Sequence, residues 1–137
     1  MARFEAQGFR SGPPGVDSGT VAKGPDGHFW ADADVNGKRV HFLVDTGATA
    51  VALTPTDAAK LGFRLEDLQY SYQVTTAGGS SHAAAVTLAV VSINGAKLNN
   101  VHALVVEDGL DVSLLGMSYL GRLTRFEATR ETLRFEP

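Results

Sequence analysis

The chain of 137 residues contains no cysteine, which excludes disulfide bonds, thiolate metal sites and thiol catalysis. Long apolar runs are missing as well, because the longest, residues 83–91, is too short to cross a bilayer, and the N-terminus lacks the order of a signal peptide. Positive charge is not in excess either, since 12 Lys and Arg residues face 15 Asp and Glu residues and are scattered. We therefore expect a chain that contacts neither nucleic acid nor, by itself, a membrane.

What is present suits one compact domain. The length and the 44% hydrophobic content fit a single modest core. Residues 8–27 are rich in glycine and proline, a composition that disfavours regular structure. We predict a flexible N-terminal arm or linker over residues 1–27 and one folded domain over residues 28–137.

The pattern within that domain is mostly that of β-strands. Two Asn-Gly pairs, Asn36-Gly37 and Asn94-Gly95, are typical of tight hairpin turns between strands. A short helix is predicted after Thr54-Pro55, ending at Gly62, and a second from Met117 to about Leu123. The predicted strands cover residues 29–35, 38–44, 50–53, 70–76, 82–93, 97–107, 124–128 and 132–135.

The candidate for chemistry is Asp45, which follows the apolar strand residues Phe42 to Val44 and opens an Asp-Thr-Gly-Ala turn. Gly47 permits close backbone approach and offers an unobstructed amide, and Ala48 leaves room beside the acid. Thr46 adds a hydroxyl that can join one loop to another. An isolated Asp-Thr-Gly also occurs as an ordinary turn, so the strand before it and the small residues after it carry the interpretation.

One carboxylate cannot readily serve as acid and base at once, whereas two that face each other share a proton and divide the roles. The chain has a single such turn in a suitable setting, so the pattern predicts a homodimer in which each subunit contributes one Asp45. The predicted chemistry is hydrolysis of a peptide bond by an activated water.

Several stretches in order along the chain resemble the retropepsin-like aspartic proteases, and most closely the bacterial single-domain, often membrane-anchored group. A glycine-rich hairpin follows the Asp turn by about thirty residues, and an apolar-apolar-glycine run precedes a short helix. The matching segments, which together extend over roughly residues 27–135, are 27–30, 35–37, 42–49, 51–53, 74–77 and 113–118.

The resemblance implies an all-β, closed β-barrel-like protomer of one lobe with one or two short helices. It implies a homodimeric aspartic endopeptidase that cuts a protein or peptide substrate without metal or cofactor. It also implies a periplasmic protein tethered to the inner membrane through an upstream anchor. The residue roles that it implies are catalysis for Asp45; loop support for Thr46, Gly47, Ala48, Leu114, Leu115 and Gly116; and a substrate-covering flap for Thr75, Thr76, Ala77, Gly78, Gly79 and Ser80.

Two alternatives stay open at this point. The same fold could serve as a dimerisation or peptide-binding module without turnover. The long arm and the C-terminal hairpin also differ from the short interleaved termini of retroviral relatives, so the interface could be built differently and the resting state could be monomeric.

Other acids, hydroxyls and imidazoles are poorer candidates. Asp17-Ser18-Gly19 follows prolines and not an apolar strand, so it is interpreted as a loop turn. Asp32 and Asp34 alternate on a polar strand face, which indicates solvated side chains. The run 80–82 offers hydroxyls beside His82, but neighbouring strand residues point to opposite faces. The four histidines lie in separate segments without the spacing of a metal site.

Overall fold

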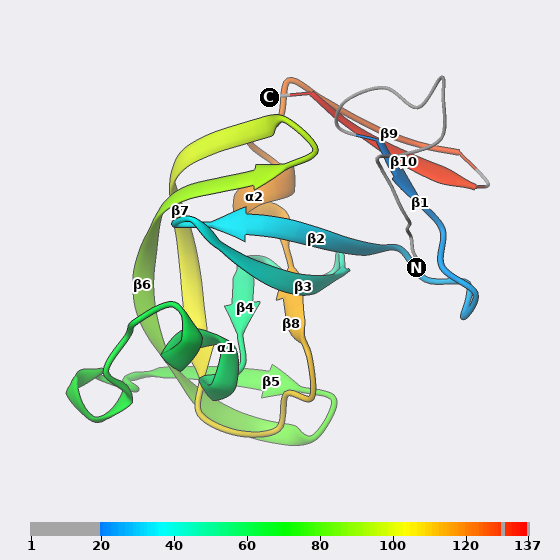
Figure 1. The fold of residues 1–137 in the computed structure, drawn as a ribbon. Helices are drawn as coiled ribbons and strands as arrows, with labels where there is room; N and C mark the ends of the chain where they lie inside the picture. The colour runs from blue at the N-terminus through cyan, green and yellow to red at the C-terminus, as the bar shows by residue number, and fades with distance from the viewer. Residues whose placement is uncertain (1–19, 130, 137) are drawn as a thin grey trace.

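The computed structural model describes residues 20–129 and 131–136; residues 1–19, 130 and 137, and with them Asp17 and most of the predicted arm, lie outside the described part (Figure 1). Strands dominate, as predicted. They are β1 (Thr20–Ala22), β2 (Trp30–Val35), β3 (Lys38–Val44), β4 (Val51–Leu53), β5 (Tyr72–Thr76), β6 (Gly79–Ile93), β7 (Ala96–Val106), β8 (Ser113–Leu115), β9 (Arg125–Ala128) and β10 (Thr132–Glu136). The helices are α1 (Pro55–Lys60), the 3-10 turn η1 (Leu65–Asp67) and α2 (Met117–Leu120).

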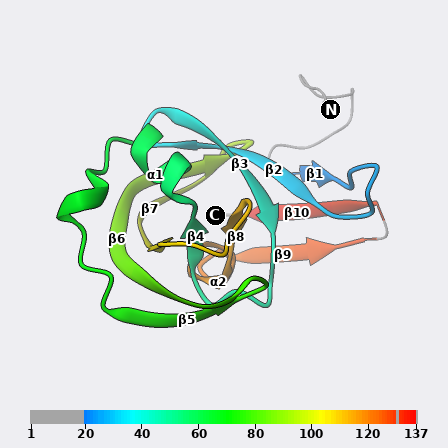
Figure 2. The ribbon, with the colours of Figure 1, turned by 90° about the horizontal axis from the view of Figure 1, so that it is seen from below.

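Six strands close into a barrel. The hydrogen-bonded order runs β2, β3, β8, β4, β7 and β6, and β6 pairs again with β2 through Asp34↔Ser92 and Val35↔Val91. The β3–β8 and β4–β7 pairs are parallel and the other barrel pairs are antiparallel. The sequence-predicted closed, all-β, single-lobed fold is thereby confirmed. Strand β5 extends the sheet beyond the barrel, because it pairs with β6 in a hairpin (Figure 2).

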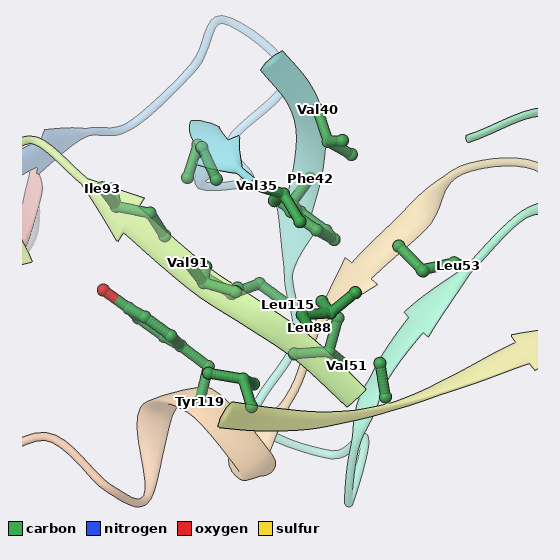
Figure 3. Close-up of a cluster of buried hydrophobic side chains, with 14 of the residues drawn as sticks. Val35, Val40, Phe42, Val51, Leu53, Leu88, Val91, Ile93, Leu115 and Tyr119 are labelled. Atoms are coloured by element: carbon green, nitrogen blue, oxygen red, sulfur yellow. The ribbon is translucent and has the colours of Figure 1, made fainter. Parts of the chain in front are cut away.

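The core fills the barrel mainly with branched aliphatic side chains, together with a few aromatic ones. Strand alternation points Val35, Val40 and Phe42 of the first hairpin inward, where they are fully buried. Leu88, Val91 and Ile93 of β6 join them, together with Leu115 and Tyr119 (Figure 3). Tyr119 brings a hydroxyl into this apolar setting and donates it to the carbonyl of Ala96 at 2.5 Å, while burial raises the pKa of the phenol.

A separate three-stranded sheet lies beside the barrel, with β10 between β1 and β9 (Figure 1). Its Phe126 and Phe135 rings stack at 5.7 Å, and Phe135 also meets Tyr119 edge-on at 6.1 Å, which joins the sheet to the core. Strand β1 falls inside the range 1–27 predicted as an arm. The predicted start near His28 missed it because three residues between glycine-rich segments carry too little periodicity to indicate a strand.

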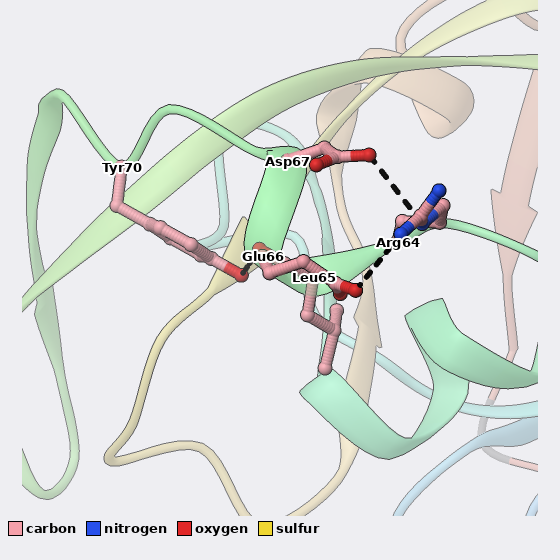
Figure 4. Close-up of polar contacts among 5 residues, drawn as sticks. All are labelled: Arg64, Leu65, Glu66, Asp67 and Tyr70. Carbon is pink, nitrogen blue, oxygen red and sulfur yellow. Dashed lines mark hydrogen bonds and ion pairs between the residues drawn. The ribbon is translucent and has the colours of Figure 1, made fainter.

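The segment between α1 and β5 is held by local polar contacts (Figure 4). Arg64 contacts Glu66 and Asp67, each at 3.4 Å, around η1. The Tyr70 hydroxyl donates to the carbonyl of Leu65 at 3.2 Å. Burial, and secondarily the charge of Glu107, raises the pKa of Tyr70. These contacts fix the chain just before it enters the hairpin of β5 and β6.

The predicted turns and helices are present with small shifts. Both Asn-Gly pairs have positive φ at each residue, 50° and 84° for Asn36-Gly37 and 50° and 89° for Asn94-Gly95, as a tight hairpin needs. Thr54 caps α1 by accepting the Asp57 amide at 3.1 Å, and Pro55 takes the first helical position. None of the helices in the described part of the chain has the length and apolarity needed to cross a membrane.

Candidate active site

The Asp45 turn is positioned by two neighbouring strands. Strand β3 pairs in parallel with β8, and the Asp45 amide continues this ladder by donating to the Leu115 carbonyl at 3.1 Å. The turn closes through the Ala48 amide, which donates to the Asp45 carbonyl at 3.1 Å. The Gly47 amide donates to Asp45 Oδ1 at 2.9 Å and so orients the carboxylate. Asp45 is half-buried and Thr46 and Gly47 are exposed, so the turn is open to solvent.

Gly116 lets the start of α2 pack directly on this turn. A Cβ at Gly116 would lie 2.2 Å from the Ala50 carbonyl oxygen and 2.8 Å from that of Ala48, so only glycine fits. The Met117 amide donates to the Ala48 carbonyl at 2.8 Å across the same contact. The structure thus brings the predicted supporting segment against the Asp45 turn.

Ser118 is a supporting residue that the sequence analysis missed. Its hydroxyl accepts the Val51 amide at 2.8 Å and donates to the His102 carbonyl at 2.6 Å. It therefore ties α2 to β4 and β7, immediately behind the Asp45 turn. A serine in a short helix carries no sequence signal for such a contact, because both partners are backbone groups far away along the chain.

Asp45 lines a cleft of about 810 Å³. The walls come from the Asp45 turn, β4, the hairpin of β5 and β6, the end of β7, and the loop of residues 109–112 that leads into β8. Of the predicted site residues, those on the wall are Asp45, Gly47, Ala48, Leu114, Thr75, Thr76, Ala77 and Gly78. Thr46, Leu115, Gly116, Gly79 and Ser80 are not on the wall. Leu115 and Gly116 instead are buried against the turn.

The hairpin tip rests on its own chain's 109–112 loop. A Cβ on Gly78 would come within 3.0 Å of Gly109 Cα, so the two backbones meet with only hydrogens between them. Gly109 has a φ of 82°, and a Cβ there would lie 2.6 Å from Thr76 Oγ1. Next to this contact the Ser81 hydroxyl donates to Asp108 Oδ1 at 2.6 Å and accepts the Asp108 amide at 3.2 Å. The hairpin is therefore held over the cleft by contacts within one protomer.

The poorer candidates lie elsewhere. Asp32 contacts His41 Nδ1 at 2.7 Å, and His41 stacks on Trp30 at 4.9 Å, on the exposed side of the first hairpin. The hydrogen bond from His41 is the main reason that the pKa of Asp32 is lowered. Ser81 bonds to Asp108 and not to the imidazole of His82. Among residues 20–129 and 131–136, no three acidic or imidazole side chains gather as a metal site would need.

Comparison with known proteins places this geometry in a family. Residues 31–122, more than half of the chain, match the family described as "gag-polyprotein putative aspartyl protease". A retropepsin-like aspartic protease from Rickettsia conorii, known from its crystal structure, is 43% identical, with a TM-score of 0.75 over 83% of this chain and 94% of that one. The chain belongs to the retropepsin-like aspartic proteases.

Further relatives extend this picture. An uncharacterized protein of Rickettsia prowazekii is 43% identical over 82% of this chain, and one encoded in the cobV 5′ region of a Sinorhizobium species is 43% identical over 80%. The chain spans about half the length of these curated relatives, 48% and 47%. EIAV protease complexed with the inhibitor HBY-793 is 21% identical, with a TM-score of 0.55 over 67% of this chain and 84% of that one, which supports the fold alone.

Proposed function

We propose that the protein is an aspartic endopeptidase whose active site forms when two protomers bring their Asp45 turns together. The observation that carries the proposal is the open Asp45 turn at the wall of a cleft. Its carboxylate is oriented by the Gly47 amide and its backbone is fixed by β8. One protomer offers a single acid of this kind within the described residues, and amide hydrolysis by this chemistry needs two.

The two carboxylates would act as one unit. Like charges at contact distance cannot both ionise cheaply, so the pair holds one shared proton. The ionised carboxylate takes a proton from a bound water as the water oxygen adds to the carbonyl carbon, and the protonated one donates to the carbonyl oxygen. The tetrahedral intermediate collapses when the amide nitrogen receives a proton and the C–N bond breaks. Symmetry makes the acid and base labels interchangeable before substrate binds.

The substrate would bind as an extended peptide. Within the described chain, β5 is the terminal strand of the seven-stranded sheet, so its outer edge is available for backbone hydrogen bonds to a peptide strand. Residues 73–78 of this hairpin line the same cleft as Asp45, which supports binding of the peptide between the hairpin and the Asp45 turn. Binding would require the hairpin to lift from the 109–112 loop, as a flap does.

The test is cleavage of a mixed peptide pool from acid to neutral pH by the wild type and by Asp45→Asn, each with and without pepstatin. We expect cuts that pepstatin suppresses and that the Asp45→Asn variant does not make. Asp34→Asn, an exposed aspartate outside the cleft, is the matched control and should cut as the wild type does. Equal cleavage by Asp45→Asn would reject the mechanism, and peptide capture without any cleavage would favour the binding-module alternative.

We also propose that the full-length protein is tethered to the inner membrane and faces the periplasm. This rests on its resemblance to the membrane-anchored bacterial group. Fractionation of cells that express the full-length gene would test it: recovery in the membrane fraction with accessibility to protease from the periplasm supports the proposal, and recovery in the cytosolic fraction contradicts it.

A further inference from the structure

The cleft walls that the structure describes carry acidic side chains and no basic ones. Among residues 20–129 and 131–136, two ionisable side chains line the cleft, Asp45 and Asp111, and no Lys, Arg or His does so. Most of the remaining wall is apolar, from residues such as Leu43, Leu104 and Leu110. A peptide lying here would therefore meet a largely apolar surface that also carries the Asp111 carboxylate.

Asp111 differs from Asp108, three residues before it, because no group among the described residues holds the Asp111 carboxylate. Asp108 is engaged by the hydroxyl of Ser81, and it is not on the cleft wall. Asp111 is exposed, and no hydrogen bond or ion pair occupies its carboxylate among the residues that the structure describes. Its carboxylate is thus free to accept a charged donor from a bound ligand.

We propose that Asp111 is a specificity-determining residue that selects substrates with a Lys or Arg side chain near the scissile bond. This rests on the proposed function. A cationic side chain beside Asp111 would form an ion pair, and its aliphatic stem would lie along the neighbouring apolar wall. An acidic side chain there would meet a like charge, so the site discriminates in both directions. Because a homodimer supplies Asp111 twice, the preference should occur at one position on each side of the cut.

The expected size of the preference for Lys follows from the solvent exposure of the Asp111 carboxylate. An ion pair that remains in contact with water discriminates by roughly two- to fivefold at low ionic strength. Screening by salt should reduce that factor, since the Debye length falls to about 3 Å at 1 M salt. The expected preference is therefore modest and dependent on salt, in contrast to a preference set by the shape of an apolar pocket.

The experiment compares kcat/KM for matched peptides that carry Lys, Glu or the uncharged residue norleucine at each position around the cut. The enzymes are the wild type, Asp111→Asn, Asp111→Lys and the control Asp34→Asn, with folding of each checked by thermal unfolding. We expect a two- to fivefold preference for Lys in the wild type and in Asp34→Asn, roughly equal use in Asp111→Asn, and a preference for Glu-containing peptides in Asp111→Lys.

The outcomes separate the two proposals. Cleavage without a preference for Lys, or a preference that Asp111→Asn retains, would overturn the role of Asp111 and leave the protease function intact. No cleavage of any peptide by the wild type would overturn both. A preference lost in Asp111→Asn and reversed in Asp111→Lys supports the assignment.

Discussion

Ser113, the first residue of β8, is fully buried, and its hydroxyl has two hydrogen-bond partners inside the protein, at the start of α1. It donates to Asp57 Oδ2 at 2.5 Å and accepts the Thr54 amide at 3.1 Å. Replacement of Ser113 by alanine removes both bonds while hardly changing side-chain volume. The half-buried Asp57 carboxylate can recover a water molecule, but the Thr54 amide at the edge of the barrel is left without its partner.

The magnitude follows from these two bonds. A hydrogen bond to a charged group contributes about 1.5–3 kcal/mol, and a buried donor left unsatisfied costs about 1–3 kcal/mol. Allowing for the water that Asp57 regains, we expect Ser113→Ala to lower the free energy of unfolding by about 2–4 kcal/mol. The helix cap, in which the Asp57 amide donates to Thr54 Oγ1, does not use the Ser113 hydroxyl and is not removed by this substitution.

The assay is urea unfolding followed by circular dichroism at one fixed protein concentration, since self-association would make stability depend on concentration. Ser92→Ala is the matched control, because Ser92 is only half-buried and has no side-chain hydrogen bond within the described residues; we expect a change within about 0.5 kcal/mol. A loss below about 1 kcal/mol in Ser113→Ala, or an equal loss in Ser92→Ala, would refute the reasoning.

Three further predictions concern the turn, the hairpin and pH. Gly116→Ala would put a Cβ 2.2 Å from the Ala50 carbonyl oxygen, so we expect at least about 3 kcal/mol of destabilisation in urea unfolding, and a stable variant would contradict the packing described. Gly109→Ala would drive the hairpin tip off the loop, which hydrogen exchange should detect as faster exchange at residues 76–79; unchanged protection would argue against the contact. The pKa of Asp32 is lowered from 3.8 by the His41 hydrogen bond, so its contribution is present above that pH and is lost as the pH falls through the folded pKa. Asp32→Asn should therefore reduce stability by about 0.5 kcal/mol at pH 5 and by less below pH 3.8, and a loss that grows on acidification would contradict the sign.

The sequence predicts those strands that are marked by their own residues and by the turns next to them. The first hairpin is predicted as strands over residues 29–35 and 38–44, and β2 and β3 are found there, because the strand pattern and the Asn36-Gly37 turn agree. The end of β3 placed Asp45 correctly after a strand. Strand β8 was not predicted, because three residues ahead of a helix carry no periodicity, and its pairing with β3 and β4 is set by closure of the barrel.

The parts of the site that sequence could not supply depend on contacts between distant segments. Asp111 and Gly109 follow a strand in an acidic loop, and nothing local indicates that the loop lines the cleft below the hairpin. Asn100, within β7, adopts a φ of 54°, although the sequence predicts an uninterrupted strand there. It lies opposite the part of β6 where the alternation of buried and exposed side chains changes phase. Such features arise from the curvature of the closed sheet and not from the propensity of single residues.

Subunit mixing tests the central claim most directly. Wild-type protein is mixed with Asp45→Asn protein at a concentration where sedimentation shows that dimers dominate, and cleavage is measured at a constant amount of wild type. If each active site needs Asp45 from both protomers, random pairing predicts activity that falls to about one half at equal amounts and to about one tenth at a ninefold excess of the variant. Activity that stays constant as the variant is added would contradict a shared dyad.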